Sequence, residues 1–197
     1  KDIAPDVTED MTLLNTYGTV IDKIETCVTL AELQNSASLK LLKEQYNSVV
    51  PACEGTGMLT DALVTIPIEE AKKLGYVIPT SYKETKVPQI NFETLDEMLK
   101  ICAENGLYYR FHPLLFHDTN FEWFYREDYS TTGAFVSPEV MNARMEFYIR
   151  SVMKHVYDSE YGACVYTWDV VNEYWNATPN NWIAIYGKQN YTPSFVK

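Results

Sequence analysis

The sequence lacks several features that define other classes of protein. Its apolar runs all stay below the roughly 18 residues that a membrane-spanning helix needs, so we expect no membrane span. Basic residues are few: 16 Lys and Arg stand against 27 Asp and Glu, giving a net charge of −11. Nucleic acid would require a basic face, so a nucleic-acid partner is disfavoured. No Gly-rich phosphate loop follows an expected strand, which also disfavours a nucleotide-binding fold.

Metal ligands are scarce as well. His112 and His117 lie five residues apart in an extended run and would point to opposite faces, so we expect no shared metal and no cofactor. The four cysteines form no Cys-x-x-Cys pair, and most lie in strand-like contexts. Buried thiols are therefore favoured over a disulfide framework. The four are Cys27, Cys53, Cys102 and Cys164.

What the sequence does contain is typical of a globular protein. With 197 residues, 46% of them hydrophobic and 14% aromatic, the chain can bury one sizeable core. The 15 Tyr and 4 Trp offer flat surfaces that suit stacking against sugars, although most aromatic side chains belong to the core. The chain begins at Lys1 without Met, so we expect a processed or trimmed piece whose signal peptide is out of view.

Strands alternate with helices along the chain. The expected strands cover residues 24–30, 48–53, 107–116 and 165–173, and the expected helices cover 30–45, 91–105 and 137–157. Residues 54–90 are rich in Gly and Pro, and we expect a long irregular insertion there with one helical turn at 69–74. The alternation indicates an α/β fold with a parallel sheet. Four βα units make half of a (β/α)8 barrel, although their connections fit an open doubly wound sheet equally well.

The fourth expected strand carries the most informative stretch. It reads Y-T-W-D-V-V-N-E and ends abruptly in Asn172 and Glu173. Period-2 alternation would place Asp169 and Glu173 on one face and Asn172 on the other. A carboxylate at the carboxyl end of a barrel strand is a typical position for a catalytic group. The alternative is a buried strand that simply meets a polar loop.

Several motifs together resemble family 10 glycoside hydrolases, the xylanase family. Residues 110–117 read R-F-H-P-L-L-F-H and are followed by Trp123-Phe124, which is similar to the family's R-G-H-T-L-V-W-H…W-F segment. Residues 168–173 match its W-D-V-V-N-E acid/base motif at every position. Residues 46–49 resemble its second strand, and residues 182–187 and 191–197 resemble the start of the helix after the fourth strand. The resemblance covers nearly the whole chain in the right order.

This resemblance implies a retaining endo-1,4-β-xylanase on a (β/α)8 barrel. Glu173 would be the general acid and then the base, and Asn172 would bind the 2-hydroxyl of the sugar at subsite −1. Retention requires a second carboxylate about 5–5.5 Å away as nucleophile. In the family this nucleophile lies far downstream, and only 24 residues follow Glu173 (197 − 173). Residues 1–197 are thus expected to be an amino-terminal half whose other half is a separate chain, a continuation or a cleaved product.

The resemblance also implies a set of supporting residues. His112 would face the −1 sugar, with a satisfied core histidine as the alternative. Arg110 shares the strand face of His112 and is expected to pair with a carboxylate inside the barrel. Asp169 would support Glu173 or serve structure alone. The other candidates are the substrate-binding Phe116, Trp123 and Trp175, for whose Trp rings core packing is the alternative, and the supporting His117.

The sequence also departs from the family pattern. The family's second strand ends E-N-E-M-K, whose Asn and Lys grip the −2 sugar, whereas residues 52–59 read A-C-E-G-T-G-M-L. Depending on the alignment, Cys53 and Thr56 or Thr56 and Leu59 replace them, and the Lys is absent either way. Phe111, Phe116 and Thr119 stand where the family has Gly, Trp and Gln. We therefore expect an altered −2 subsite on an enzyme that acts on xylan or xylo-oligosaccharides outside the cell. The alternatives are a non-hydrolytic carbohydrate-binding barrel and a retaining β-glycanase of another specificity.

Overall fold

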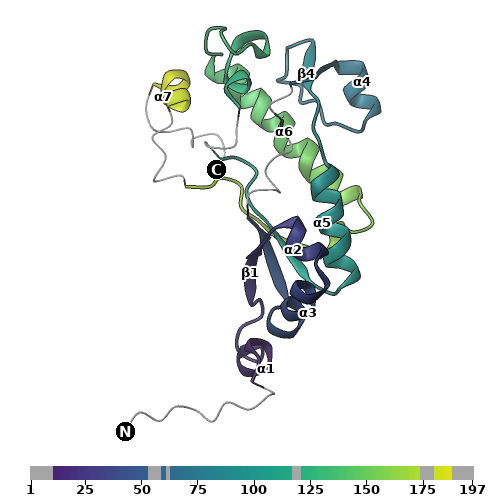
Figure 1. Cartoon of the computed structure of the whole chain (residues 1–197). Coiled ribbons are helices and arrows are strands. Elements are labelled where there is room, and N and C mark those ends of the chain that lie inside the picture. Colours follow the sequence, from purple (N-terminus) through teal and green to yellow (C-terminus); the bar gives the residue numbers. More distant parts are fainter. Residues whose placement is uncertain (1–10, 53–58, 61–62, 117–120, 174–179, 188–197) are drawn as a thin grey trace.

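Four parallel strands form the centre of the molecule (Figure 1). The computed structural model describes residues 11–52, 59–60, 63–116, 121–173 and 180–187. The strands are β1 (Glu25–Val28), β2 (Ser48–Pro51), β5 (Tyr108–Phe111) and β6 (Val165–Trp168), in the spatial order β1-β2-β5-β6. Thr26 pairs with Val49, Val49 with Tyr109, and Tyr109 with Val165, so sequential strands lie side by side.

Helices connect these strands and gather on one side of the sheet (Figure 1). The connecting helices are α2 (Leu30–Gln34), α3 (Ser36–Gln45), α5 (Glu93–Glu104) and α6 (Pro138–Asp158), and α7 (Asn180–Tyr186) follows β6. Ser137 caps α6 by accepting a hydrogen bond from the backbone N–H of Val140, and Pro138 occupies its first turn. The predicted series of four βα units around a parallel sheet is confirmed.

The prediction of one helix over residues 30–45 was wrong in detail. Asn35 has an extended backbone, and its side chain accepts hydrogen bonds from the N–H groups of Ala37 and Ser38. A side chain used in this way starts a new helix, so Asn35 separates α2 from α3. A further short helix, α1 (Leu13–Tyr17), precedes the sheet and was not expected.

The insertion is more ordered than expected. Within it, β3 (Thr65–Pro67) and β4 (Lys86–Pro88) pair as an antiparallel two-stranded sheet, with Ile66 opposite Val87. Between them lies α4 (Ile68–Lys73), close to the expected helical turn. The insertion contacts α6, where the backbone N–H of Val77 donates to Ser151 Oγ at 3.0 Å.

Two strands end earlier than predicted. β5 stops at Phe111, since His112-Pro113 follows and Pro has no N–H to continue the ladder. β6 stops at Trp168. Beyond it, the segments that follow β5 and β6 stay side by side, because the N–H groups of Leu114 and Leu115 donate to the carbonyls of Asp169 and Val170. Glu173 therefore does not lie on a regular strand, and simple alternation with Asp169 does not apply to it.

The two faces of the sheet have different surroundings. Val49, Tyr109 and Phe111 are fully buried against the helices. On the opposite face, Tyr108 and Tyr166 remain 42% and 38% exposed. We call this second face the concave face, because it corresponds to the interior of a barrel.

The cysteine prediction held only in part. Cys102 and Cys164 are buried thiols, whereas Cys27, on β1, is exposed. Cys53 lies outside the described residues. Cys27 follows Glu25 by two residues and so shares the concave face, which explains its exposure.

Within the described ranges, no helix is long and apolar enough to cross a membrane. The same residues contain no group of three or more His, Cys, Asp or Glu side chains placed to hold a metal ion.

Candidate active site

Arg110, on the concave face of β5, connects β1 with the first residue after β6. From β5, its Nε donates to Asp169 Oδ2 at 2.8 Å and its Nη2 donates to Asp169 Oδ1 at 3.1 Å. Its Nη1 donates to Glu25 Oε1, on β1, at 2.7 Å. The pKa of Arg110 lies above its ordinary value because its hydrogen bonds to Asp169 and then Glu25 stabilise the cation. The expected pairing of Arg110 with a carboxylate is present, and there are two such carboxylates.

Asp169 also holds His112. Nδ1 of His112 lies 2.7 Å from Asp169 Oδ2. Burial of Asp169 alone would raise its pKa, but the hydrogen bonds from Arg110 and His112 outweigh burial and lower it, so its carboxyl stays ionised. Because Nδ1 of His112 is engaged, a ligand of this half-buried ring would meet Nε2. Asp169 thus orients a polar ring at the carboxyl-terminal edge of the sheet.

Asn172 and Glu173 lie at that same edge. The backbone N–H of Asn172 donates to the carbonyl of Leu115 at 2.9 Å, which anchors the segment after β6 to the segment after β5. Asn172 is half-buried, and Glu173 is exposed. Glu173 has φ of +50°, in the left-handed region that non-glycine residues rarely adopt. Such backbone strain concentrates at functional sites.

The aromatic residues predicted to bind sugar lie in different environments. Trp123 is only 4% exposed, and its ring stacks on Phe121 with 5.9 Å between centroids and meets the edges of Phe124 and Tyr129. This packing corresponds to the core alternative for Trp123. Phe116 is half-buried. Both His117 and Trp175 lie outside the described residues.

One residue of this network was missed in the sequence. Glu25 accepts from Arg110 and, through Oε2, from the hydroxyl of Tyr166 at 2.9 Å. Finding it required the pairing of β1 with β2 and of β2 with β5, which places Glu25 level with Tyr108 and on the same face as Arg110, two residues further along β5. The available signal was a charged residue at the start of the first expected strand, which is unusual for a strand buried in a barrel.

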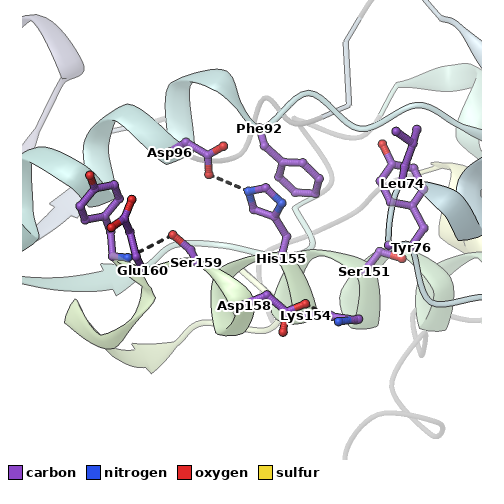
Figure 2. Close-up of a pocket in the computed structure, with 12 residues that line it drawn as sticks. Leu74, Tyr76, Phe92, Asp96, Ser151, Lys154, His155, Asp158, Ser159 and Glu160 are labelled. Carbon is purple, nitrogen blue, oxygen red and sulfur yellow. Dashed lines mark hydrogen bonds and ion pairs between the residues drawn. The ribbon is translucent and has the colours of Figure 1, made fainter.

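A separate hollow of about 400 Å³ lies between the insertion, α5 and α6 (Figure 2). His155 lies in its wall, with Nε2 2.6 Å from Asp96 Oδ1 and its ring stacked on Phe92 at 3.7 Å between centroids. None of the motif residues around Glu173 lines this hollow. We therefore place the candidate active site at the edge of the sheet and assign His155 a structural role between the two helices.

Comparison with known proteins identifies the family of this chain. The profile of "Glycosyl hydrolase family 10" matches residues 13–197. Endo-1,4-beta-xylanase A of Butyrivibrio fibrisolvens is 41% identical over 191 residues, which are 94% of this chain and 46% of the relative. The bifunctional endo-1,4-beta-xylanase XylA of Ruminococcus flavefaciens is 29% identical over 183 residues, 89% of this chain and 18% of that protein. The chain thus spans about half or less of the length of these curated relatives.

Solved structures share the fold. The endo-1,4-beta-D-xylanase 10B of Clostridium thermocellum, as CBM22-1–GH10 modules complexed with xylohexaose, superposes with a TM-score of 0.68 at 19% identity, covering 95% of this chain and 36% of that one. An endo-1,4-beta-xylanase from Caldicellulosiruptor owensensis gives a TM-score of 0.63 at 22% identity, covering 88% of this chain and 45% of that one.

The structure is part of a (β/α)8 barrel with polar and acidic side chains at the carboxyl ends of its strands. The chain belongs to glycosyl hydrolase family 10.

Proposed function

We propose that residues 1–197 form the amino-terminal half of the catalytic barrel of a retaining endo-1,4-β-xylanase. The observation that carries this proposal is the Arg110–Asp169–His112 network, which lies beside an intact W-D-V-V-N-E segment ending in an exposed carboxyl. The relatives named as endo-1,4-beta-xylanases support xylan as the substrate.

In this proposal Glu173 exchanges a proton with the substrate. Its carboxyl protonates the glycosidic oxygen while the bond from that oxygen to the anomeric carbon breaks. It then removes a proton from the water that releases the sugar from the enzyme. Asn172 binds the 2-hydroxyl of the −1 sugar, and His112, oriented by Asp169, faces the same sugar. The exposure of Glu173 at the carboxyl-terminal edge of the sheet supports this role.

We propose that the carboxy-terminal half of the barrel completes the site. The reaction needs a second carboxylate about 5–5.5 Å from Glu173 to attack the anomeric carbon. The described sheet supports a covering partner of the same barrel, because its edge strands β1 and β6 each have a neighbour on one side only and its concave face leaves Tyr108 and Tyr166 partly exposed. Since xylan is too large to cross a membrane, we place the enzyme outside the cell.

The glycone side of the cleft is proposed to be altered. Leu59 is apolar and only 3% exposed, so it cannot replace the sugar-gripping Lys of the family. Cys53, Thr56 and Thr119 lie outside the described residues. Each missing donor would weaken binding at subsite −2 by about 1–3 kcal/mol. Short unsubstituted xylo-oligosaccharides should therefore be poor substrates, and a kcat/KM on xylotriose equal to that of an ordinary family member would contradict this.

Sugar release from xylan by the intact protein tests the function, with cellulose and mannan assayed beside it. We expect release from xylan, its loss in Glu173→Gln, and full activity in Glu104→Gln, which alters an exposed Glu at the far end of α5. Binding of xylan without release by the wild type would favour the non-hydrolytic barrel instead. Faster release from cellulose or mannan would favour another β-glycanase.

A further inference from the structure

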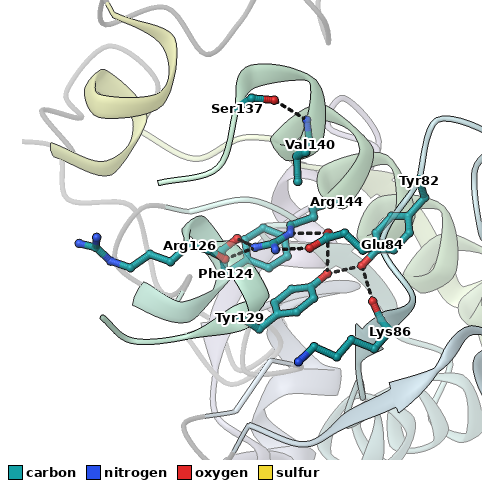
Figure 3. Close-up of polar contacts among 9 residues, drawn as sticks. All are labelled: Tyr82, Glu84, Lys86, Phe124, Arg126, Tyr129, Ser137, Val140 and Arg144. Carbon is teal, nitrogen blue, oxygen red and sulfur yellow. Dashed lines mark hydrogen bonds and ion pairs between the residues drawn. The ribbon is translucent and has the colours of Figure 1, made fainter. Parts of the chain in front are cut away.

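A fully buried arginine lies outside the proposed catalytic residues. Arg144, on α6, has no exposed surface. Its Nε and Nη2 donate to Glu84 Oε2 and Oε1 at 2.8 and 2.5 Å, and its Nη1 donates to the carbonyls of Phe124 and Arg126 at 2.8 Å each (Figure 3). Glu84 belongs to the insertion after β2, whereas Phe124 and Arg126 belong to the loop after β5. One guanidinium thus binds two segments that are about 40 residues apart in the sequence.

Two tyrosines reinforce the connection. The Arg144 guanidinium carbon lies 3.8 Å from the centre of the Tyr129 ring, and the Tyr129 hydroxyl forms a hydrogen bond with the hydroxyl of Tyr82. The Tyr82 hydroxyl also reaches the carbonyl of Lys86 at 2.9 Å (Figure 3). Tyr82 comes from the insertion and Tyr129 from the loop after β5, so a second bridge crosses the same boundary.

The loop after β5 depends on such support. Asp128 and Tyr129 have φ of 55° and 57°, two consecutive non-glycine residues in the left-handed region. Each costs of the order of 1 kcal/mol or more and persists only where the surroundings hold it. Tyr129 is 2% exposed, and its ring lies against the Arg144 guanidinium, so the strained turn packs directly on this network.

The buried groups that connect the two segments keep defined protonation states. Burial alone would lower the pKa of Arg144, but its hydrogen bonds to Glu84 outweigh burial and the pKa is raised, so the cation persists. Burial raises the pKa of both Tyr82 and Tyr129, so both phenols stay protonated. A buried cation whose carboxylate partner is removed is left uncompensated, and the segments around it must rearrange.

The two segments that Arg144 connects both start at the edge of the sheet that carries Glu173. The insertion starts at the carboxyl end of β2 and the second loop at the carboxyl end of β5, the same edge at which Glu173 lies. In barrels of this type the loops at this edge form the walls of the active site. We propose that Arg144 and Glu84 are positioning residues that lock the insertion to the loop of residues 121–136 and so fix the substrate-binding wall beside β2 and β5.

This inference rests on the proposed function and deepens it. Neither Arg144 nor Glu84 touches the substrate in this account; they act through the two loops. Their loss should therefore raise KM and the Kd for a long oligosaccharide while leaving kcat nearly unchanged. A residue with a merely structural role would lower the amount of folded enzyme without moving KM.

The test uses Glu84→Gln in the intact protein, with Tyr82→Phe as a milder variant that keeps the charged pair should Glu84→Gln not fold. We expect KM for xylan to rise about tenfold in Glu84→Gln, with kcat within about twofold of wild type. The Kd for xylohexaose, measured with Glu173→Gln present in both proteins so that the sugar is not cleaved, should rise by a similar factor. Tyr82→Phe should move both in the same direction by a smaller factor. Amide hydrogen exchange in residues 121–136 should quicken by about tenfold or more in Glu84→Gln.

Arg150→Met is the matched control, because Arg150 lies on the same helix and pairs with Glu146 at 2.9 Å in an exposed position. It should change none of these quantities. Unchanged exchange in residues 121–136 in folded Glu84→Gln or Tyr82→Phe would overturn the proposed coupling of the loops. Faster exchange with unchanged KM and Kd would overturn the link to the substrate. If wild type neither cleaves xylan nor binds xylohexaose, the proposed function fails together with that link, and hydrogen exchange alone then decides the coupling of the loops.

Discussion

Two nitrogens of Arg110 donate to the two carboxylate oxygens of Asp169, at 2.8 and 3.1 Å. Arg110 lies on β5, and Asp169 is the first residue after β6. The pair therefore fixes the point at which the chain leaves the sheet toward Asn172 and Glu173. Bidentate pairs of this kind set geometry as well as energy.

Arg110→Met should destabilise the protein by about 1–2 kcal/mol, because Asp169 and Glu25 both lose their main partner. The loss stays small because the Arg110 side chain is 37% exposed and solvent screens its charges. Denaturant unfolding measures the change. Arg150→Met, which removes an exposed pair, should cost about 0.5 kcal/mol or less. Equal losses in the two variants would contradict the role given to Arg110.

Asp169 should make stability depend on pH. Its pKa in the folded protein is lowered, so its contribution is present above its ordinary pKa of 3.8 and is lost as pH falls through the still lower folded value. Wild type should therefore lose stability as the pH falls below about 4. Asp169→Asn should be less stable than wild type at neutral pH and should show a smaller drop over that acidic range. Denaturation midpoints followed from neutral to acidic pH test this, and parallel curves for the two proteins would contradict it.

Thiol reactivity should report whether the concave face is covered. Burial raises the pKa of Cys102 to about 12 and that of Cys164 to about 11, so both should react slowly with iodoacetamide. Cys27 is exposed here but lies on the face that the other half of the barrel is proposed to cover. In the intact protein Cys27 should react as slowly as the two buried thiols until denaturant is added. Fast labelling of Cys27 in the native protein would show that this face is open.

Trp123 should matter for stability more than for sugar binding. Its ring is 4% exposed among Phe121, Phe124 and Tyr129, so Trp123→Ala should cost about 3–5 kcal/mol of unfolding free energy. Trp123→Phe, which keeps an aromatic ring, should recover much of that loss. A rise in KM without loss of stability would instead identify Trp123 as a sugar platform.

Local signals in the sequence predicted the elements that depend on neighbours in the chain. Ser137-Pro138 marked the start of α6, and the alternation of apolar strands with helices predicted the parallel sheet. Local alternation also predicted that Arg110 and His112 lie on one strand face, and both bind Asp169. Such features are fixed within a few residues of sequence, so periodicity and capping rules reach them.

Features that depend on distant partners escaped prediction. β3 and β4 pair Thr65 with Pro88 across a long connection, and both strands end in proline, which ordinarily argues against a strand. Glu25 entered the site only through the register of three strands. Arg144 was not singled out, because an arginine within an amphipathic helix usually faces solvent, and its burial is set by Glu84 from a segment that looked irregular.

The role of Glu173 as proton donor is tested most directly by comparing two leaving groups in Glu173→Ala. A dinitrophenyl xylobioside needs no protonation of its leaving group, whereas the glycosidic oxygen of xylan does. Loss of the acid should slow cleavage of xylan by roughly 10²–10⁴-fold. The first, bond-breaking step with the dinitrophenyl substrate should stay within about tenfold of wild type, seen as a rapid burst of dinitrophenol. If the bond-breaking step with the dinitrophenyl substrate slows as much as the cleavage of xylan, Glu173 is not the proton donor.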